Sequence, residues 1–224
     1  MMNQKAKKVL RGTFHMYLIW TIWYLGFCLL AIFGVAVFAA NPNGEWEWSL
    51  LQGAMQANRI YMLVLGILSM GGLLTYYVSN GITRRDYFSG VAAAAMLLSV
   101  FLVIVTGLLH GAERMLFGWG LSEESLGLTF VMAFFQLIVF YFVGWLISAG
   151  FYLFHWLIGL AFIGIGIVII SIFDYVWGHI GQQQFDFLPV TDISPAVGIV
   201  ISLLLSLGLI SVMRSLTKRA VVKP

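Results

Sequence analysis

Charged residues are scarce in this chain. Asp, Glu, Lys and Arg make up only 9% of its 224 residues, whereas 61% are hydrophobic. A soluble domain carries roughly 25% charged residues. The mean hydropathy is correspondingly high, at +0.97. This composition indicates a polytopic membrane protein and argues against a soluble domain.

Cysteine and the common catalytic motifs are equally rare. Cys28 is the only cysteine, so it cannot form an internal disulfide, and no His or Cys lies near it at metal-ligand spacing. The sequence has no Gly-x-Ser-x-Gly turn, no His-Glu-x-x-His pair, and no lysine that follows a glycine as in a phosphate-binding loop. We therefore expect no catalytic residue, no metal site and no bound cofactor in this chain.

The few cations are unevenly distributed. Ten of the twelve Lys and Arg residues lie in three segments, namely Lys5, Lys7, Lys8 and Arg11, then Arg84 and Arg85, then Arg214, Lys218, Arg219 and Lys223. Short segments rich in Lys and Arg stay on the cytoplasmic side during insertion, so both termini are expected in the cytoplasm of a cell-membrane protein. The clusters can also contact anionic lipid headgroups. They lack the interleaved aromatic residues of a nucleic-acid reader, so no nucleic-acid partner is expected.

Apolar runs alternate with these segments. A helix needs about 20 residues to cross the hydrocarbon core of a bilayer. We predict a single domain over 1–224, an all-α fold with six transmembrane helices near 15–40, 59–79, 88–109, 127–148, 151–173 and 194–213. The apolar run 126–173 is too long for one crossing, and Ser148-Ala149-Gly150 is the expected break. The basic residues ahead of the first span form either a short surface helix or a disordered tail.

The central parts of the predicted spans contain no Asp, Glu, Lys or Arg. Ionisable residues inside a bilayer usually mark proton relays, ion sites or voltage sensors. Their absence argues against a secondary transporter coupled to protons or sodium and against an ion pump. If the protein transports a substrate, another subunit must supply the energy.

The segment between the second and third spans, 77–90, carries a distinct local pattern. Asn80 and Gly81 both tolerate left-handed dihedral angles and are expected to end the preceding helix. Thr83 followed by Asp86 is typical of a capping box, in which the Thr oxygen accepts an early amide hydrogen and the acid lies near the positive helix end. We expect a short helix here that leads into the third span and presents Arg84 and Arg85 to the cytoplasm.

This segment resembles the permease subunits of type-2 ABC exporters, which commonly have a helix break, a Gly-x-Thr-Arg turn, and then an acid and an aromatic residue. The matching positions are Gly81, Thr83, Arg84, Asp86 and Phe88. The layout of six spans with inward termini is similar as well. The resemblance implies that this loop is a coupling helix docked on a separate ATPase subunit, and that 174–193 is a lid over the translocation path. It implies these ATPase-coupling residues: Asn80, Gly81, Thr83, Arg84, Arg85, Asp86 and Phe88.

The resemblance implies a permease that pairs with a second permease subunit and with two ATP-binding subunits, which hold the ATP and Mg²⁺. The chain itself is then not an enzyme. Its substrate is expected to be exported and at least partly apolar, such as a hydrophobic peptide, a lipid-like molecule or a drug. The alternative is a non-transporting membrane protein, an immunity or sensor component that acts through protein contacts. A substrate-capturing subunit of a vitamin importer is a third, less favoured reading.

Overall fold

The computed structural model describes residues 3–38, 50–117, 123–177 and 193–220, and it contains only helices within these ranges. The helices are α1 (Gln4–Phe38), α2 (Leu50–Met70), α3 (Gly72–Ser79), α4 (Arg84–Phe117), α5 (Glu123–Leu153), α6 (Trp156–Trp177) and α7 (Pro195–Arg219). The prediction of an all-helical chain is confirmed for the described residues.

Most of these helices are suited to a bilayer. Five of them are long and apolar enough to cross a membrane. The α2 residues Gly53–Met70 form a further candidate together with α3, because the two helices pass the same test as one pair bent by 42°. The structure therefore has the character of a membrane-embedded protein, with six spans where the bent pair is counted as one.

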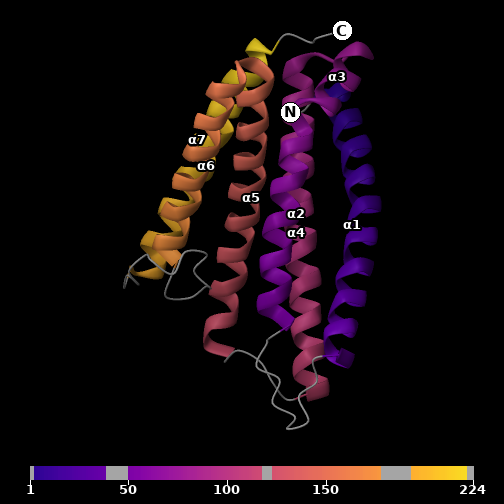
Figure 1. The fold of residues 1–224 in the computed structure, drawn as a ribbon, viewed down its shortest axis with the longest axis vertical. Coiled ribbons are helices and arrows are strands. Elements are labelled where there is room, and N and C mark those ends of the chain that lie inside the picture. The colour runs from indigo at the N-terminus through magenta and orange to yellow at the C-terminus, as the bar shows by residue number, and fades with distance from the viewer. Residues whose placement is uncertain (1–2, 39–49, 118–122, 178–192, 221–224) are drawn as a thin grey trace.

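Neighbouring helices alternate in direction along the long axis (Figure 1). The start of α1, the turn between α3 and α4, the break between α5 and α6, and the end of α7 all lie at one end of the bundle. We call it the basic end because it gathers the cations of three separate segments: Lys5, Lys7, Lys8, Arg11, Arg84, Arg85, Arg214, Lys218 and Arg219. The three basic segments that the sequence analysis singled out therefore lie at the same end of the bundle.

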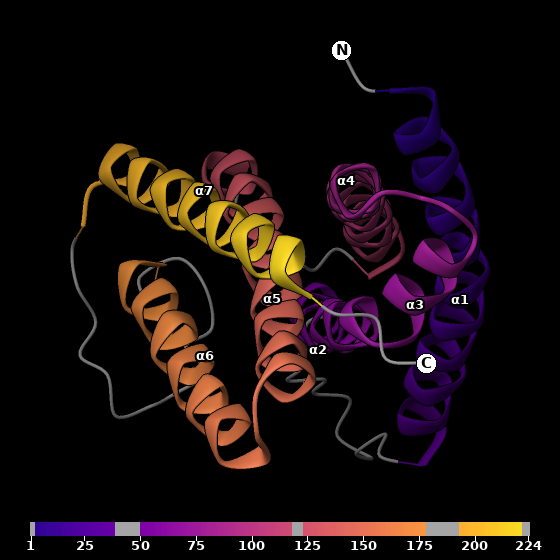
Figure 2. The same cartoon turned by 90° about the horizontal axis from the view of Figure 1, so that it is seen from above.

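Helix α5 occupies the middle of the bundle and contacts α2, α4, α6 and α7 (Figure 2). Its tightest contact is with α2, where two glycines allow the backbones to touch. A Cβ added at Gly66 would lie 2.0 Å from the carbonyl oxygen of Tyr141, and one added at Gly144 would lie 2.1 Å from that of Leu63. In lipid the hydrophobic effect does not drive helices together, and close contacts at small residues stabilise their association by van der Waals packing.

The break between α5 and α6 lies at Phe154 and His155, so the prediction of a break at Ser148-Ala149-Gly150 was wrong. Those small residues are helical, and they serve packing. A Cβ at Gly150 would lie 2.6 Å from the ring of Phe162 on α6. Here small size permits a close helix contact, which the sequence alone does not distinguish from a flexible turn.

Residues 4–11 form neither a separate surface helix nor a disordered tail, and residues 1–2 lie outside the described residues. Helix α1 begins at Gln4 and continues to Phe38 without interruption. Ala6 and Val9 are buried, and a Cβ added at Gly90 of α4 would lie 2.7 Å from the Val9 side chain. Both earlier expectations failed because contact with α4 holds the start of α1 in the bundle.

Candidate functional site

The turn between α3 and α4 is built as its residues predict. Gly81 has a φ of 75°, in the left-handed region that glycine adopts without strain. Asn80 donates a hydrogen bond from its amide nitrogen to the carbonyl oxygen of Tyr76 at 2.7 Å, which satisfies part of the end of α3. From α1, the Lys5 ammonium donates to the Gly81 carbonyl oxygen at 3.3 Å. The predicted helix break at Asn80 and Gly81 is confirmed.

The Thr83 cap is also confirmed. The Asp86 amide donates to the Thr83 hydroxyl oxygen at 3.2 Å, and that hydroxyl donates to the Asp86 carboxylate at 2.8 Å. However, this cap starts the long helix α4 at Arg84, and no separate helix lies over 80–88. The predicted short coupling helix in that position was wrong, because the helix that starts at the Thr83 cap continues without a break into the span. The short helix at this end is α3, which precedes the turn.

The residues predicted to couple to an ATPase differ in accessibility. Four are exposed, namely Asn80, Gly81, Thr83 and Arg85, while Arg84 is half-buried. Asp86 and Phe88 are only 8% and 7% exposed. These two side chains can position the turn, but they cannot form much of a contact surface.

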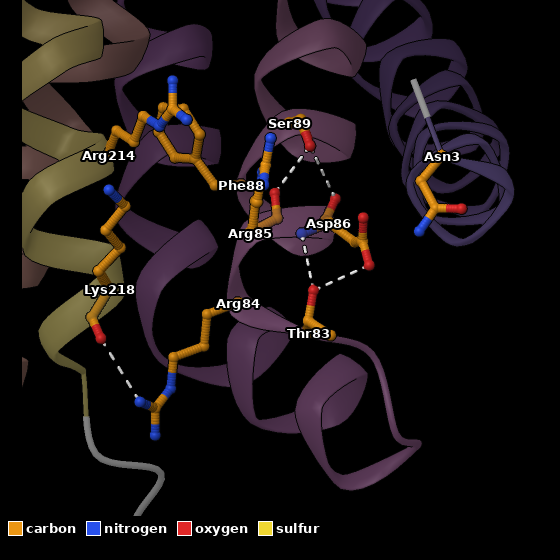
Figure 3. Close-up of a pocket in the computed structure, with 9 residues that line it drawn as sticks. All are labelled: Asn3, Thr83, Arg84, Arg85, Asp86, Phe88, Ser89, Arg214 and Lys218. Atoms are coloured by element: carbon orange, nitrogen blue, oxygen red, sulfur yellow. Dashed lines mark hydrogen bonds between the residues drawn. The ribbon is translucent and has the colours of Figure 1, made fainter. Parts of the chain in front are cut away.

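A groove of about 680 Å³ lies beside the turn (Figure 3). It is lined by Thr83, Arg84, Arg85, Asp86, Phe88 and Ser89 near the start of α4, by Arg214 and Lys218 of α7, and by Asn3. The Arg84 guanidinium donates to the Lys218 carbonyl oxygen at 3.4 Å and so connects the two helices. We call this the basic groove. The sequence reasoning used Arg214 and Lys218 for topology and for contact with lipid headgroups, and it did not place them beside Arg84, although their spacing of four residues puts them on one helix face.

The start of α4 is tied to the core by aromatic packing. The rings of Tyr87 and Phe88 lie 6.2 Å and 5.4 Å from the ring of Trp145 on α5, measured between centroids. Trp145 is fully buried. Tightly packed protein interiors have low compressibility and transmit strain. A displacement of the Arg84-Arg85 segment should therefore be passed to α5 through these packed rings.

A buried hydroxyl cluster lies next to the bend between α2 and α3. The Ser69 hydroxyl is 2.7 Å from that of Tyr141, and the Tyr17 hydroxyl is 2.9 Å from that of Tyr141. The Tyr87 hydroxyl donates to the Ser69 carbonyl oxygen. A bend interrupts the regular backbone bonds of a helix, and in lipid another group must satisfy the freed carbonyl. The cluster thus stabilises the bend and joins α1, α2, α4 and α5 there.

Changing Tyr87 to Phe should therefore lower stability, since the Ser69 carbonyl loses its buried donor. We expect a loss of about 1–3 kcal/mol, measured as reduced resistance to thermal or SDS-induced unfolding of the detergent-solubilised protein. Tyr76→Phe is the matched control, because Tyr76 is 62% exposed. Equal stability of the two variants would contradict the role given to Tyr87.

Besides Asp86, two further charged side chains are buried among the described residues, and the sequence reasoning missed both. Arg59 of α2 and Asp174 of α6 are 2% and 3% exposed, and the two interact electrostatically. The sequence analysis considered only the central parts of the predicted spans, and these two charges lie nearer to span ends, at the boundaries of the predicted ranges. α2 begins at Leu50, so Arg59 is well inside it, and α6 continues to Trp177, beyond Asp174.

No group of three or more His, Cys, Asp or Glu side chains that could hold a metal ion occurs within residues 3–38, 50–117, 123–177 and 193–220. Cys28 is a free, half-buried thiol in α1. Of the predicted lid, 174–177 belong to α6, Ile193 precedes α7, and 178–192 lie outside the described residues.

Comparison with known proteins identifies no relative that would assign a role to this turn. No family model, curated protein or solved structure matches the chain. The resemblance to type-2 ABC permeases stays a prediction that rests on the capped turn and the helix layout.

Proposed function

We propose that this chain is the membrane-spanning permease subunit of an ABC exporter, driven by a separate ATPase. The observation that carries the proposal is the exposed turn at the basic end. Its exposed and half-buried residues form a compact surface (Asn80, Gly81, Thr83, Arg84 and Arg85). Short segments rich in Lys and Arg favour the cytoplasmic side, where an ATPase would be reached.

The connections of the turn support a coupling role. On one side it follows α3, which is bent by 42° from α2 near Gly71. On the other side Phe88 packs against Trp145 of α5. Closure of an ATPase pair would pull on the turn, and the displacement would pass to α2 by the bend and to α5 by the rings. The two ATPase states would thereby bias the permease between inward and outward access.

A dimer is the natural unit for this function. The middle of the bundle is filled by α5, whose Tyr141, Phe142 and Trp145 are fully buried. A translocation path would therefore form between two permease subunits. Exposed side chains on α1, such as Trp23 at 78% and Phe27 at 73%, suit contact with lipid or with an at least partly apolar substrate.

Reversing the charges of the turn tests the proposal. Tagged wild-type protein, purified from its native membranes in mild detergent, should retain a soluble subunit with a phosphate-loop ATPase motif. Arg84→Glu with Arg85→Glu should reduce the retained ATPase more than about tenfold, since each lost interfacial charge contact costs about 2 kcal/mol or more. The amount is measured by quantitative mass spectrometry.

The matched control is Lys7→Glu with Lys8→Glu, an equal charge change on exposed residues of α1 at the same end. It should retain the ATPase, and a protease-accessibility assay checks that both variants insert in the wild-type orientation. An ATPase that stays bound to a correctly inserted Arg84/Arg85 variant would refute the coupling role. Wild-type protein that carries no ATPase would favour the non-transporting alternative.

A further inference from the structure

The basic groove has an excess of positive charge. Its lining contains four cations and the single carboxylate of Asp86, and that carboxylate accepts the hydroxyl hydrogen of Thr83. Among the described residues, none of the four cations forms an ion pair with a carboxylate, and Arg84 uses one N–H on a backbone oxygen. A concave site lined by one sign of charge raises the local concentration of the opposite charge.

The cations come from two helices and lie around one space. Arg84 and Arg85 begin α4, whereas Arg214 and Lys218 are one turn apart on α7 and are both exposed. Figure 3 shows the side chains of Arg84, Arg214 and Lys218 in the space between the two helices. Guanidinium groups bind phosphate oxygens with paired N–H donors, and an ammonium adds a point charge. A phosphate group fits this donor set.

Apolar faces continue from these cations toward the other end of the bundle. On α4, positions three or four residues apart below Arg85 and Ser89 share a face, and its exposed apolar side chains are Met96, Leu97, Val100 and Ile104. On α7, the same spacing below Lys218 and Arg214 leads to Leu207, Leu204, Leu203 and Val200, which are exposed as well. The two helices contact each other, and an apolar face continues along each of them from the cations of the basic groove.

We propose that the basic groove binds the phosphate of an anionic phospholipid, with its acyl chains along the exposed faces of α4 and α7. The cations alone would accept any phosphate, but the apolar faces select a ligand with hydrocarbon attached. Clusters of Lys and Arg at the end of a span are placed where headgroups of the inner leaflet lie. The site requires no transport activity, but it shares Arg84 and Arg85 with the proposed ATPase contact, so the test below changes only Arg214 and Lys218.

The test measures lipid binding to the purified chain. Delipidated protein is titrated with phosphatidylglycerol in detergent micelles, and the bound lipid is counted by native mass spectrometry. Removing two cations with Arg214→Gln and Lys218→Gln should weaken binding of the first lipid about tenfold or more, because each Lys or Arg beside an anionic headgroup adds to the free energy of binding. Arg214→Lys should retain most of the affinity.

Three comparisons decide the outcome. Lys7→Gln with Lys8→Gln removes the same charge outside the basic groove and should change the lipid affinity less than twofold. If this variant lost as much affinity as the Arg214/Lys218 variant, the attraction would be non-specific and the site would be refuted. Phosphatidylcholine should bind more weakly than phosphatidylglycerol, and equal binding would refute it too. Glycerol phosphate should compete poorly with phosphatidylglycerol for the site. If millimolar glycerol phosphate displaced the bound lipid as effectively as added lipid does, the site would be one for soluble phosphates, and the lipid assignment would be overturned. Size-exclusion profiles confirm that each variant is folded.

Discussion

Alanine at Gly144 is expected to prevent the bundle from assembling. The new Cβ would lie 2.1 Å from the Leu63 carbonyl oxygen, an atom that cannot move without displacing the backbone of α2. Overpacking of cores costs about 1–3 kcal/mol when side chains can adjust, so a rigid neighbour should bring the cost to the upper end or above. Gly66→Ala should behave alike, because its Cβ would meet the Tyr141 carbonyl oxygen. The readout is the yield of monodisperse protein and its resistance to SDS-induced unfolding.

Two other glycines supply matched controls. Gly164 of α6 and Gly208 of α7 have no heavy atom within 4 Å of an added Cβ. Alanine there should leave stability unchanged or raise it by about 0.5–1 kcal/mol, since Ala loses less conformational freedom in a helix than Gly. Wild-type stability of the Gly144 and Gly66 variants would mean that α2 and α5 are not in backbone contact.

Local chemistry made part of this structure predictable. The Asn80-Gly81 break and the Thr83 cap each depend on a few adjacent residues, and both are present. Helix existence likewise followed from long apolar runs. Helix ends were less predictable. Apolar residues continue through the break at Phe154, and the hydrophobicity of a span does not indicate where it contacts neighbouring helices.

The rest of the site depends on tertiary structure. The approach of Arg84 to Lys218 joins residues 134 positions apart, and nothing local in either segment requires it. The packing of Phe88 on Trp145 is similar, since aromatic residues are common throughout this chain. The sequence identified which residues are polar and basic, whereas the arrangement of α4 beside α7 determined that they share one groove.

The buried charges lead to the second large effect. Changing Arg59 to Met should leave Asp174 buried without the guanidinium it interacts with, and changing Asp174 to Leu should do the reverse to Arg59. Loss of one member of a buried pair costs about 3–5 kcal/mol, whereas replacing both by apolar residues is often neutral. Each single variant should therefore unfold at a much lower SDS fraction or temperature, and the double variant should regain most of the stability of the wild type.

This double-mutant cycle separates structure from function. Arg11→Met serves as control, since Arg11 is exposed on α1 and its loss should change stability by less than about 0.5 kcal/mol. Single variants as stable as the wild type, or effects that simply add, would show that the two charges are not coupled. A stable double variant that lacks the proposed export activity would mean that the two charges are kept for function, because charges within spans are costly to bury and usually mark a functional site. A stable double variant that retains the proposed export activity would restrict Arg59 and Asp174 to a structural role.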